Sequence, residues 1–217
     1  MEKRQLPFLT VVALAHLIKT HEVSPVEVVE AHLERIERLN PQLHAFLTVC
    51  PEDARRAART AEHEIAHGAY RGALHGIPCA VKDQLSTRGI RTTAGSPLFA
   101  DVVPDEDATV IAKLHQAGAI LLGKLNMTEF GTTGFSHQFS TPRNPWDLAR
   151  YTGSSSSGSG AATAAGLCAT SLGACPRKKS LKNNALKLRR DDFKISHFPE
   201  TRVLTGGQNF CTSLKNF

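Results

Sequence analysis

The 217-residue chain is 41% hydrophobic and carries a formal net charge of +6, a length that suits one ordinary domain or part of a larger one. No apolar run is long enough to span a membrane, and the first residues lack the apolar core of a signal peptide. Five cysteines without paired spacing (Cys50, Cys79, Cys168, Cys175 and Cys211) predict free thiols in a reducing compartment, so we expect a cytoplasmic protein.

Residues 1–70 predict a set of helices that covers the rest of the domain. Thr10 can cap a first helix over 11–20. Ser24 and Glu27 then form a capping box, with a proline at the first helical position. The apolar residues that follow recur at helical spacing, which predicts an amphipathic helix over 25–39 that ends before a proline.

The next elements are a short strand over 43–49 and a helix over 51–67. This helix contains His63-Glu64-Ile65-Ala66-His67, which fits the HExxH pattern of zinc proteases. A third ligand is missing, because the extended pattern requires a histidine at position 73, where the chain has Ala73. We therefore expect two solvated histidines on a charged helix and no metal, and keep the zinc-protease interpretation as the last alternative.

Residues 71–173 predict an α/β arrangement. The run over 74–83 is a buried strand with Lys82 near its end, a helix covers about 107–117, and 119–123 is apolar on both faces, as parallel strands are. Strand alternating with helix favours an α/β sheet. Residues 128–150 predict loops, with a turn at Asn-Pro-Trp-Asp.

A buried lysine such as Lys82 can act as a general base. Burial disfavours the charged ammonium and lowers its pKa, so that a neutral amine becomes accessible. The alternative for a lysine at the end of a strand is an ordinary salt-bridge or surface role.

Serine and glycine dominate the stretch that begins at Tyr151, YTGSSSSGSG, and an alanine-rich helical segment follows it at 161–165. A short strand over 167–172 comes next. Composition alone is typical of a flexible linker. Serines at a helix start can meet free backbone N–H groups, and glycines let a ligand approach the backbone. These features favour an anion-binding or oxyanion-binding site.

Four motifs in this order resemble the amidase signature family: GIPCAVKD, DATVIAKLHQAGAILLGKLNMTEF, NPWD and GSSSSGSGAATAAG. The resemblance covers nearly all of residues 10–173. It implies the N-terminal part of the amidase signature fold, a mixed central sheet covered by helices, which here is incomplete. It also implies hydrolysis of amide C–N bonds without a cofactor, by a serine–cis-serine–lysine triad.

The resemblance implies roles for two residues. Lys82 would be the general base, and Ser155, on a cis peptide bond, would relay the proton. The family's nucleophilic serine lies in a later DTGGS-type loop, which would place it at Lys179 in this chain. Ser180 is one residue away, in a segment without the two glycines. No nucleophile is therefore expected, and the chain would be inactive alone.

The charge distribution changes at the same place. Residues 1–173 contain 16 Lys and Arg against 17 Asp and Glu, whereas residues 174–217 contain 10 against 3. We therefore expect a truncated amidase domain over 1–173 and an unrelated, disordered basic tail over 174–217. A frameshift, a misread intron or aberrant splicing would explain the replacement.

Two alternatives remain open. Within the same family, the glutamine-hydrolysing component of an aminoacyl-tRNA amidotransferase (its A subunit) requires a partner subunit; otherwise the expected partner is a small-molecule amide. In a different class, the basic residues 177–190 could bind nucleic acid nonspecifically.

Overall fold

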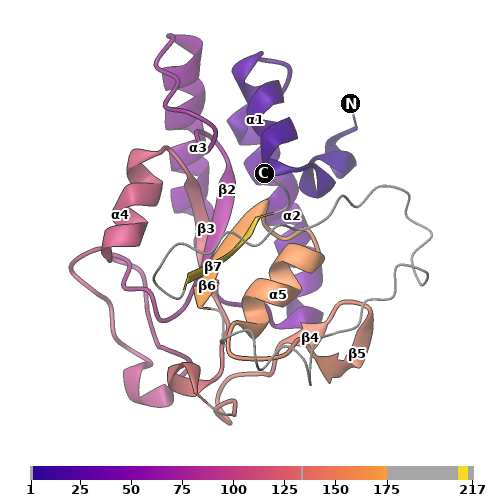
Figure 1. Cartoon of the computed structure of the whole chain (residues 1–217), viewed down its shortest axis with the longest axis vertical. Helices are drawn as coiled ribbons and strands as arrows, with labels where there is room; N and C mark the ends of the chain where they lie inside the picture. Colours follow the sequence, from indigo (N-terminus) through magenta and orange to yellow (C-terminus); the bar gives the residue numbers. More distant parts are fainter. Residues whose placement is uncertain (1, 133, 175–209, 215–217) are drawn as a thin grey trace.

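A mixed five-stranded sheet forms the centre of the fold, in the spatial order β1-β3-β2-β6-β7 (Figure 1). The computed structural model describes residues 2–132, 134–174 and 210–214. The strands of this sheet are β1 (Phe46–Val49), β2 (Pro78–Lys82), β3 (Ile120–Leu125), β6 (Thr170–Ala174) and β7 (Phe210–Leu214). β2 is parallel to both β3 and β6, and the two outer pairings are antiparallel. The predicted α/β class with a mixed sheet is confirmed.

Helices cover both faces of this sheet (Figure 1). The α-helices are α1 (Val11–Lys19), α2 (Pro25–Leu43), α3 (Pro51–Ala66), α4 (Thr109–Gln116) and α5 (Ser157–Ala164). Short 3-10 helices are η1 (Lys3–Phe8), η2 (Pro97–Phe99) and η3 (Glu129–Gly131). None of the described helices is long and apolar enough to cross a membrane.

The first two α-helices begin where the sequence predicts. The Thr10 hydroxyl accepts a hydrogen bond from the Ala13 N–H, 3.1 Å away, and so caps α1. The Ser24 hydroxyl accepts from the N–H groups of the first turn of α2, and the Glu27 carboxylate accepts from the Ser24 N–H at 2.9 Å. Both caps satisfy backbone donors that have no partner inside the helix.

The predicted end of α2 before Pro41 is wrong, since the helix continues through this proline to Leu43. Pro41 is exposed, as is Glu37, whose carbonyl loses its backbone donor, so water can satisfy this carbonyl. Leu43 is buried and holds the last turn against the core. His44 then ends the helix in the left-handed conformation, at φ 50°.

The prediction of loops over 128–150 is wrong in part. Besides η3, this segment contains β4 (Arg143–Asn144) and the start of β5 (Asp147–Tyr151), which pair as an antiparallel hairpin. The predicted turn lies between these two strands, where the Asn144 side chain accepts a hydrogen bond from the Trp146 N–H. The β5 residues are exposed and do not alternate in polarity, so hydrophobic periodicity gives no strand signal here.

Alternate residues of β2 face two different apolar layers. Ala80 belongs to the layer formed with α2, α3 and α5, whereas Cys79 and Val81 pack with Ile111 of α4. Successive side chains of a strand point to opposite faces of the sheet. Lys82 therefore follows Ala80 onto the face that α5 covers, and this register brings the lysine to the serine-rich segment.

Some of the predictions about the cysteines and the basic tail concern residues that the structure does not describe. Cys50 and Cys79 are buried free thiols, as predicted, and Cys168 is also buried, while Cys175 and the side chain of Cys211 are not described. Within the predicted tail, residues 210–214 form β7 beside β6, and residues 175–209 and 215–217 are not described. The N-terminal part contributes β1 to the sheet as well as helices.

Gly158, in the first turn of α5, lies directly against the backbone of two other segments. A β-carbon at this position would be 2.4 Å from the Ala45 carbonyl oxygen and 2.5 Å from the Asn126 nitrogen. Since backbone atoms cannot move aside cheaply, we expect Gly158→Ala to lower the free energy of unfolding by about 2 kcal/mol in urea denaturation.

Gly160 provides a matched control in the same helix. A β-carbon there would be 3.8 Å from its nearest neighbours, which are atoms of Thr152. Replacing a glycine by alanine inside a helix stabilises it by up to about 1 kcal/mol. Gly160→Ala should therefore leave stability unchanged or raise it, and equal losses in the two variants would contradict the described packing of α5.

Candidate active site

Lys82 lies at the end of β2 and is fully buried. Its ammonium nitrogen donates a hydrogen bond to the Ser155 hydroxyl oxygen, with 2.6 Å between Nζ and Oγ. Burial lowers the pKa of the Lys82 amine from its ordinary value of 10.5 to about 8. A minor but accessible neutral fraction of this amine is therefore present close to neutral pH, which is the condition for a lysine to accept a proton.

Ser155 lies two residues before the start of α5, and a cis peptide bond joins it to Ser154. Its carbonyl accepts a hydrogen bond from the Thr128 N–H at 3.2 Å, which fixes the serine backbone against the segment after β3. The structure therefore brings together the lysine and the serine that the sequence singled out, from positions 73 residues apart.

A glycine lies beside this pair. Gly131 has a φ of +72°, a conformation that L side chains rarely adopt, and a β-carbon there would lie 3.8 Å from Ser155 Oγ and 3.1 Å from Gln84 Oε1. The glycine lets the chain after β3 turn closely around the serine hydroxyl. Any larger side chain would crowd Gln84 and the space next to Ser155.

The serine-rich stretch is part of the folded core, so the flexible-linker interpretation is wrong. α5 begins at Ser157, earlier than the alanines suggest, and Ser157 and Ser159 are buried. The N-cap residue of this helix, Ser156, makes no capping hydrogen bond with its side chain. A β-carbon on Gly173 would lie 2.8 Å from Ser156 Oγ, so only glycine lets β6 pass this close to the stretch.

A second buried lysine lies near the first, and the sequence reasoning missed it. Lys124 of β3 is fully buried and donates hydrogen bonds to the Leu85 carbonyl at 2.5 Å, to Thr92 Oγ1 at 2.6 Å and to Thr87 Oγ1 at 3.2 Å. Its Nζ is 4.0 Å from the carboxylate oxygen Oδ1 of Asp83. The sequence does contain a signal for this residue, namely a lysine inside the apolar run ILLGKL. A strand that is buried on both faces keeps the charged group of such a lysine away from water.

Asp83 and Lys124 are both held away from water. Burial raises the pKa of the Asp83 carboxyl, an effect that its hydrogen bonds with Thr93 and the nearby Lys124 oppose. Burial lowers the pKa of the Lys124 amine to about 8. The other Asp83 oxygen, Oδ2, accepts hydrogen bonds from the Thr93 N–H at 2.9 Å and the Thr93 hydroxyl at 2.5 Å.

Comparison with known proteins assigns the chain to a family. A family profile described as Amidase matches residues 27–174, which is most of the chain. The chain belongs to the amidase family. The match ends at the last described residue of β6, so it includes both Lys82 and Ser155.

Individual relatives agree with this assignment. AmiD of Mycobacterium tuberculosis, a protein named as an amidase, is 49% identical over 165 residues, covering 76% of this chain and 35% of its own length. The A-type component of the glutamyl-tRNA(Gln) amidotransferase of Carboxydothermus hydrogenoformans is 43% identical over 171 residues, covering 78% of this chain and 35% of its own length. The chain therefore spans about a third of the length of the curated relatives that it matches.

Solved structures show the same fold. The peptide amidase of Stenotrophomonas maltophilia superposes with a TM-score of 0.73 at 33% sequence identity, covering 76% of this chain and 36% of that protein. The described residues therefore correspond to one part of the amidase fold.

The HExxH pattern of this amidase-family chain does not form a metal site among the described residues, where no group of three His, Cys, Asp or Glu side chains could hold an ion. His63 and His67 stack on each other with ring centroids 4.1 Å apart. Glu64 turns instead to His75, whose Nε2 is 3.0 Å from the carboxylate, and to Arg71. The HExxH residues thus lie on a helix whose glutamate forms local ion pairs.

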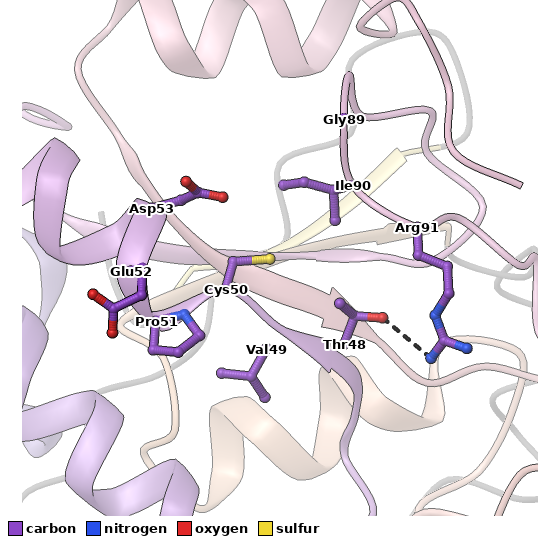
Figure 2. A pocket seen from close by; sticks show the side chains of 9 residues that line it. All are labelled: Thr48, Val49, Cys50, Pro51, Glu52, Asp53, Gly89, Ile90 and Arg91. Atoms are coloured by element: carbon purple, nitrogen blue, oxygen red, sulfur yellow. Dashed lines mark hydrogen bonds between the residues drawn. The ribbon is translucent and has the colours of Figure 1, made fainter. Parts of the chain in front are cut away.

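A pocket elsewhere in the amidase fold contains no activated nucleophile (Figure 2). It lies between the end of β1, the start of α3 and the loop at 89–91, and Cys50 lines it. Burial raises the pKa of the Cys50 thiol to about 11, and Asp53 adds to this effect. Because the thiolate is the reactive form of cysteine, this shift disfavours reaction of Cys50 at neutral pH.

The expected nucleophile position, Lys179, lies outside the described residues, as does Ser180. The basic segment 177–190, considered for nucleic-acid binding, also lies outside them. These expectations remain predictions.

Proposed function

We propose that residues 27–174 form the proton-accepting part of an amide-hydrolysing site, with Lys82 as general base and Ser155 as proton relay. The 2.6 Å hydrogen bond between Lys82 Nζ and Ser155 Oγ carries this proposal. The amidase-family match and the pKa of about 8 at a fully buried amine support it.

The proposed proton transfer follows from this geometry. An attacking hydroxyl gives its proton to Ser155 Oγ while the Ser155 hydroxyl proton moves to the neutral amine of Lys82. The oxygen of the attacking group forms a bond to the amide carbon. When the C–N bond breaks, the proton returns by the same route to the leaving amine. Ser155 is needed because Lys82 is too deeply buried to reach a nucleophile directly.

The same proposal includes the lack of a nucleophile. After Gly173 the chain continues Ala174-Cys175-Pro176-Arg177-Lys178-Lys179-Ser180, without the two glycines of the family's nucleophile loop. We therefore treat residues 1–173 as an incomplete amidase domain, with its helical cover over 1–70, and residues 174–217 as an unrelated basic tail. A cytoplasmic location is part of this proposal, because buried free thiols suit a reducing compartment.

A chimera tests whether the Lys82–Ser155 pair is competent. Residues 1–173 are joined to the part of Mycobacterium tuberculosis AmiD that follows its matching segment, which supplies the missing portion of the fold. We expect this chimera to hydrolyse simple amides. Lys82→Ala and Ser155→Ala should each lower kcat by at least about 10³-fold, since proton transfer and nucleophile activation depend on both groups.

The exposed Lys113→Met variant of the chimera provides the control, because it removes a lysine on the outside of α4. An active chimera that keeps its kcat in Lys82→Ala would contradict the assigned base. A folded but inactive chimera would contradict the proposal that these residues form the proton-accepting part.

A second candidate within the family is glutamine hydrolysis. It is favoured by the A-type components of glutamyl-tRNA(Gln) amidotransferases among the relatives, of which the one from Dehalococcoides mccartyi strain CBDB1 is 46% identical over 167 residues. Such a role would require a partner protein. Adding glutamine to the substrate panel of the chimera, and testing purified chain for a stable complex with the B-type component of an amidotransferase, separates this candidate from a simple amidase.

A further inference from the structure

We propose that Lys124 is a positioning residue for the Lys82–Ser155 pair: its buried ammonium ties the loop after β2 to the sheet, and this loop holds the backbone that fixes Ser155. The inference rests on the proposed roles of Lys82 and Ser155. It concerns a residue that does not touch either of their reacting atoms in any described contact.

The hydrogen bonds of Lys124 favour its protonated form. An ammonium group has three N–H donors, and the acceptors Leu85 O, Thr87 Oγ1 and Thr92 Oγ1 use all three. A neutral amine would leave one of these buried acceptors without a donor, which is costly. Lys82 differs, because its described hydrogen bond goes to a single hydroxyl that can itself donate or accept.

These three acceptors lie on both sides of one loop. Leu85 and Thr87 lie in the half of the loop that leaves β2, and Thr92 lies in the half that returns. One ammonium therefore joins the two halves by hydrogen bonds, and we call this arrangement the clamp. This loop is also tied to β1 by Arg91, which donates a hydrogen bond to the Leu47 carbonyl at 3.1 Å. Arg91 donates a second one to the Thr48 hydroxyl at 3.4 Å (Figure 2).

Asp83 connects this clamp to Lys82. It is the next residue in the chain, and its Oδ1 is 4.0 Å from Lys124 Nζ and has no hydrogen-bond partner among the described atoms. Its Oδ2 holds Thr93 through two hydrogen bonds, and its carbonyl accepts from the Ala94 N–H at 3.2 Å. The return of the loop is therefore fixed to the residue adjacent to the proposed base.

The loop continues this support to Ser155. The Ala94 carbonyl accepts a hydrogen bond from the Phe130 N–H at 2.9 Å, and the Ser96 hydroxyl donates to Glu129 Oε1 at 2.6 Å. The same segment after β3 carries Thr128, whose N–H donates to the Ser155 carbonyl at 3.2 Å. A series of hydrogen-bonded segments thus runs from Lys124 to the proposed relay serine.

The test uses the full chain and two variants that act on the clamp. Thr92→Val removes one acceptor of Lys124 while keeping the shape of the side chain and the charge of the lysine, and Lys124→Met removes the ammonium itself. Thr10→Val is the matched control, since it removes the hydroxyl that caps α1, which takes no part in the hydrogen bonds described here. NMR follows the titration of Lys82 through its ε-carbon, and amide hydrogen exchange follows the N–H groups of Thr128 and Phe130.

Loosening the clamp admits water to the buried amine, so the Lys82 titration midpoint is expected to rise by about one pH unit or more in Thr92→Val, towards the ordinary lysine value. Exchange at Thr128 and Phe130 should become about tenfold faster or more, because local opening needs less free energy. The α2 amides should keep their rates, and Thr10→Val should reproduce neither change.

An unchanged midpoint and unchanged exchange in Thr92→Val would overturn the inference, as would the same changes in Thr10→Val. Should Lys124→Met fail to fold, Thr92→Val and the equivalent Thr87→Val decide the outcome. If Lys82 titrates at about pH 8 in the wild type and no variant changes this midpoint, the result contradicts the positioning role of Lys124 but not the proposed function. A wild-type midpoint near 10.5 contradicts the proposed base, while the exchange rates still test the clamp.

Discussion

Purified chain is expected to show no amide turnover above that of its Lys82→Ala variant. The proposed base and relay are in place, with 2.6 Å between Lys82 Nζ and Ser155 Oγ, but neither can attack a carbonyl carbon without a nucleophile. Loss of a triad nucleophile lowers kcat on the order of 10⁶-fold. The measurement is release of ammonia or amine from a panel of simple primary and aryl amides.

The chimera with the C-terminal part of AmiD serves as the positive control for the same assay. Turnover by the chain alone that disappears in Lys82→Ala would show that some group in the 217 residues attacks the substrate, and would contradict the proposed loss of the nucleophile. Turnover that persists in Lys82→Ala would point to a contaminating enzyme, which a repeat purification under a different tag would remove.

Replacing Lys82 by methionine is expected to stabilise the chain near pH 7 and to lose this effect in alkaline solution. The amine has a pKa of about 8 in the folded chain, against the ordinary lysine value of 10.5. A difference of this size corresponds to about 3 kcal/mol. Methionine keeps the length of the side chain without a charge, so it avoids the cost of burying an ammonium.

The sign follows from the number of bound protons. Between pH 8 and 10.5 the unfolded chain holds the Lys82 proton more tightly than the folded chain does, so the stability of the wild type rises with pH in this window. Below pH 8 both states are protonated and the folded state bears the full cost. The advantage of Lys82→Met should therefore shrink by about 3 kcal/mol between about pH 7 and pH 10.5.

Urea unfolding at the two pH values gives this difference directly. Lys82→Met also loses the hydrogen bond to Ser155, which lowers its stability at both pH values. This contribution cancels when the stability difference at one pH is subtracted from that at the other. The exposed Lys113→Met controls for the removal of a lysine as such. A stability difference between Lys82→Met and wild type that does not vary with pH would contradict the lowered pKa.

The sequence was sufficient for the elements whose signals are local. The Ser24–Glu27 capping box begins α2 as predicted. The run over 74–83 contains a strand that is buried along its whole length, although this strand is shorter than predicted and covers only Pro78–Lys82. The motif order also identified Lys82 and Ser155, which the structure brings into contact. Their catalytic roles remain predictions.

The remaining features depend on contacts between distant segments, which local patterns do not contain. α2 continues past Pro41 because Leu43 is buried against the core, and periodicity gives no sign of this. The serine-rich stretch resembles a linker in composition, yet Gly158 lies against the backbone of Ala45 and Asn126. Local sequence patterns do not identify Lys124, because its three acceptors come from a loop that lies 32 to 39 residues earlier in the chain.

The most direct test of this account is the titration of Lys82 in the full chain. Protein labelled with ¹³C at the ε-carbon of lysine is followed by NMR across the neutral and alkaline range, and Lys82→Met and Lys124→Met assign the two buried lysines. We predict that the resonance lost in Lys82→Met titrates at about pH 8 and that Ser155→Ala shifts it. Titration near pH 10.5, unaffected by Ser155→Ala, would show an ordinary lysine and contradict the proposed proton acceptor.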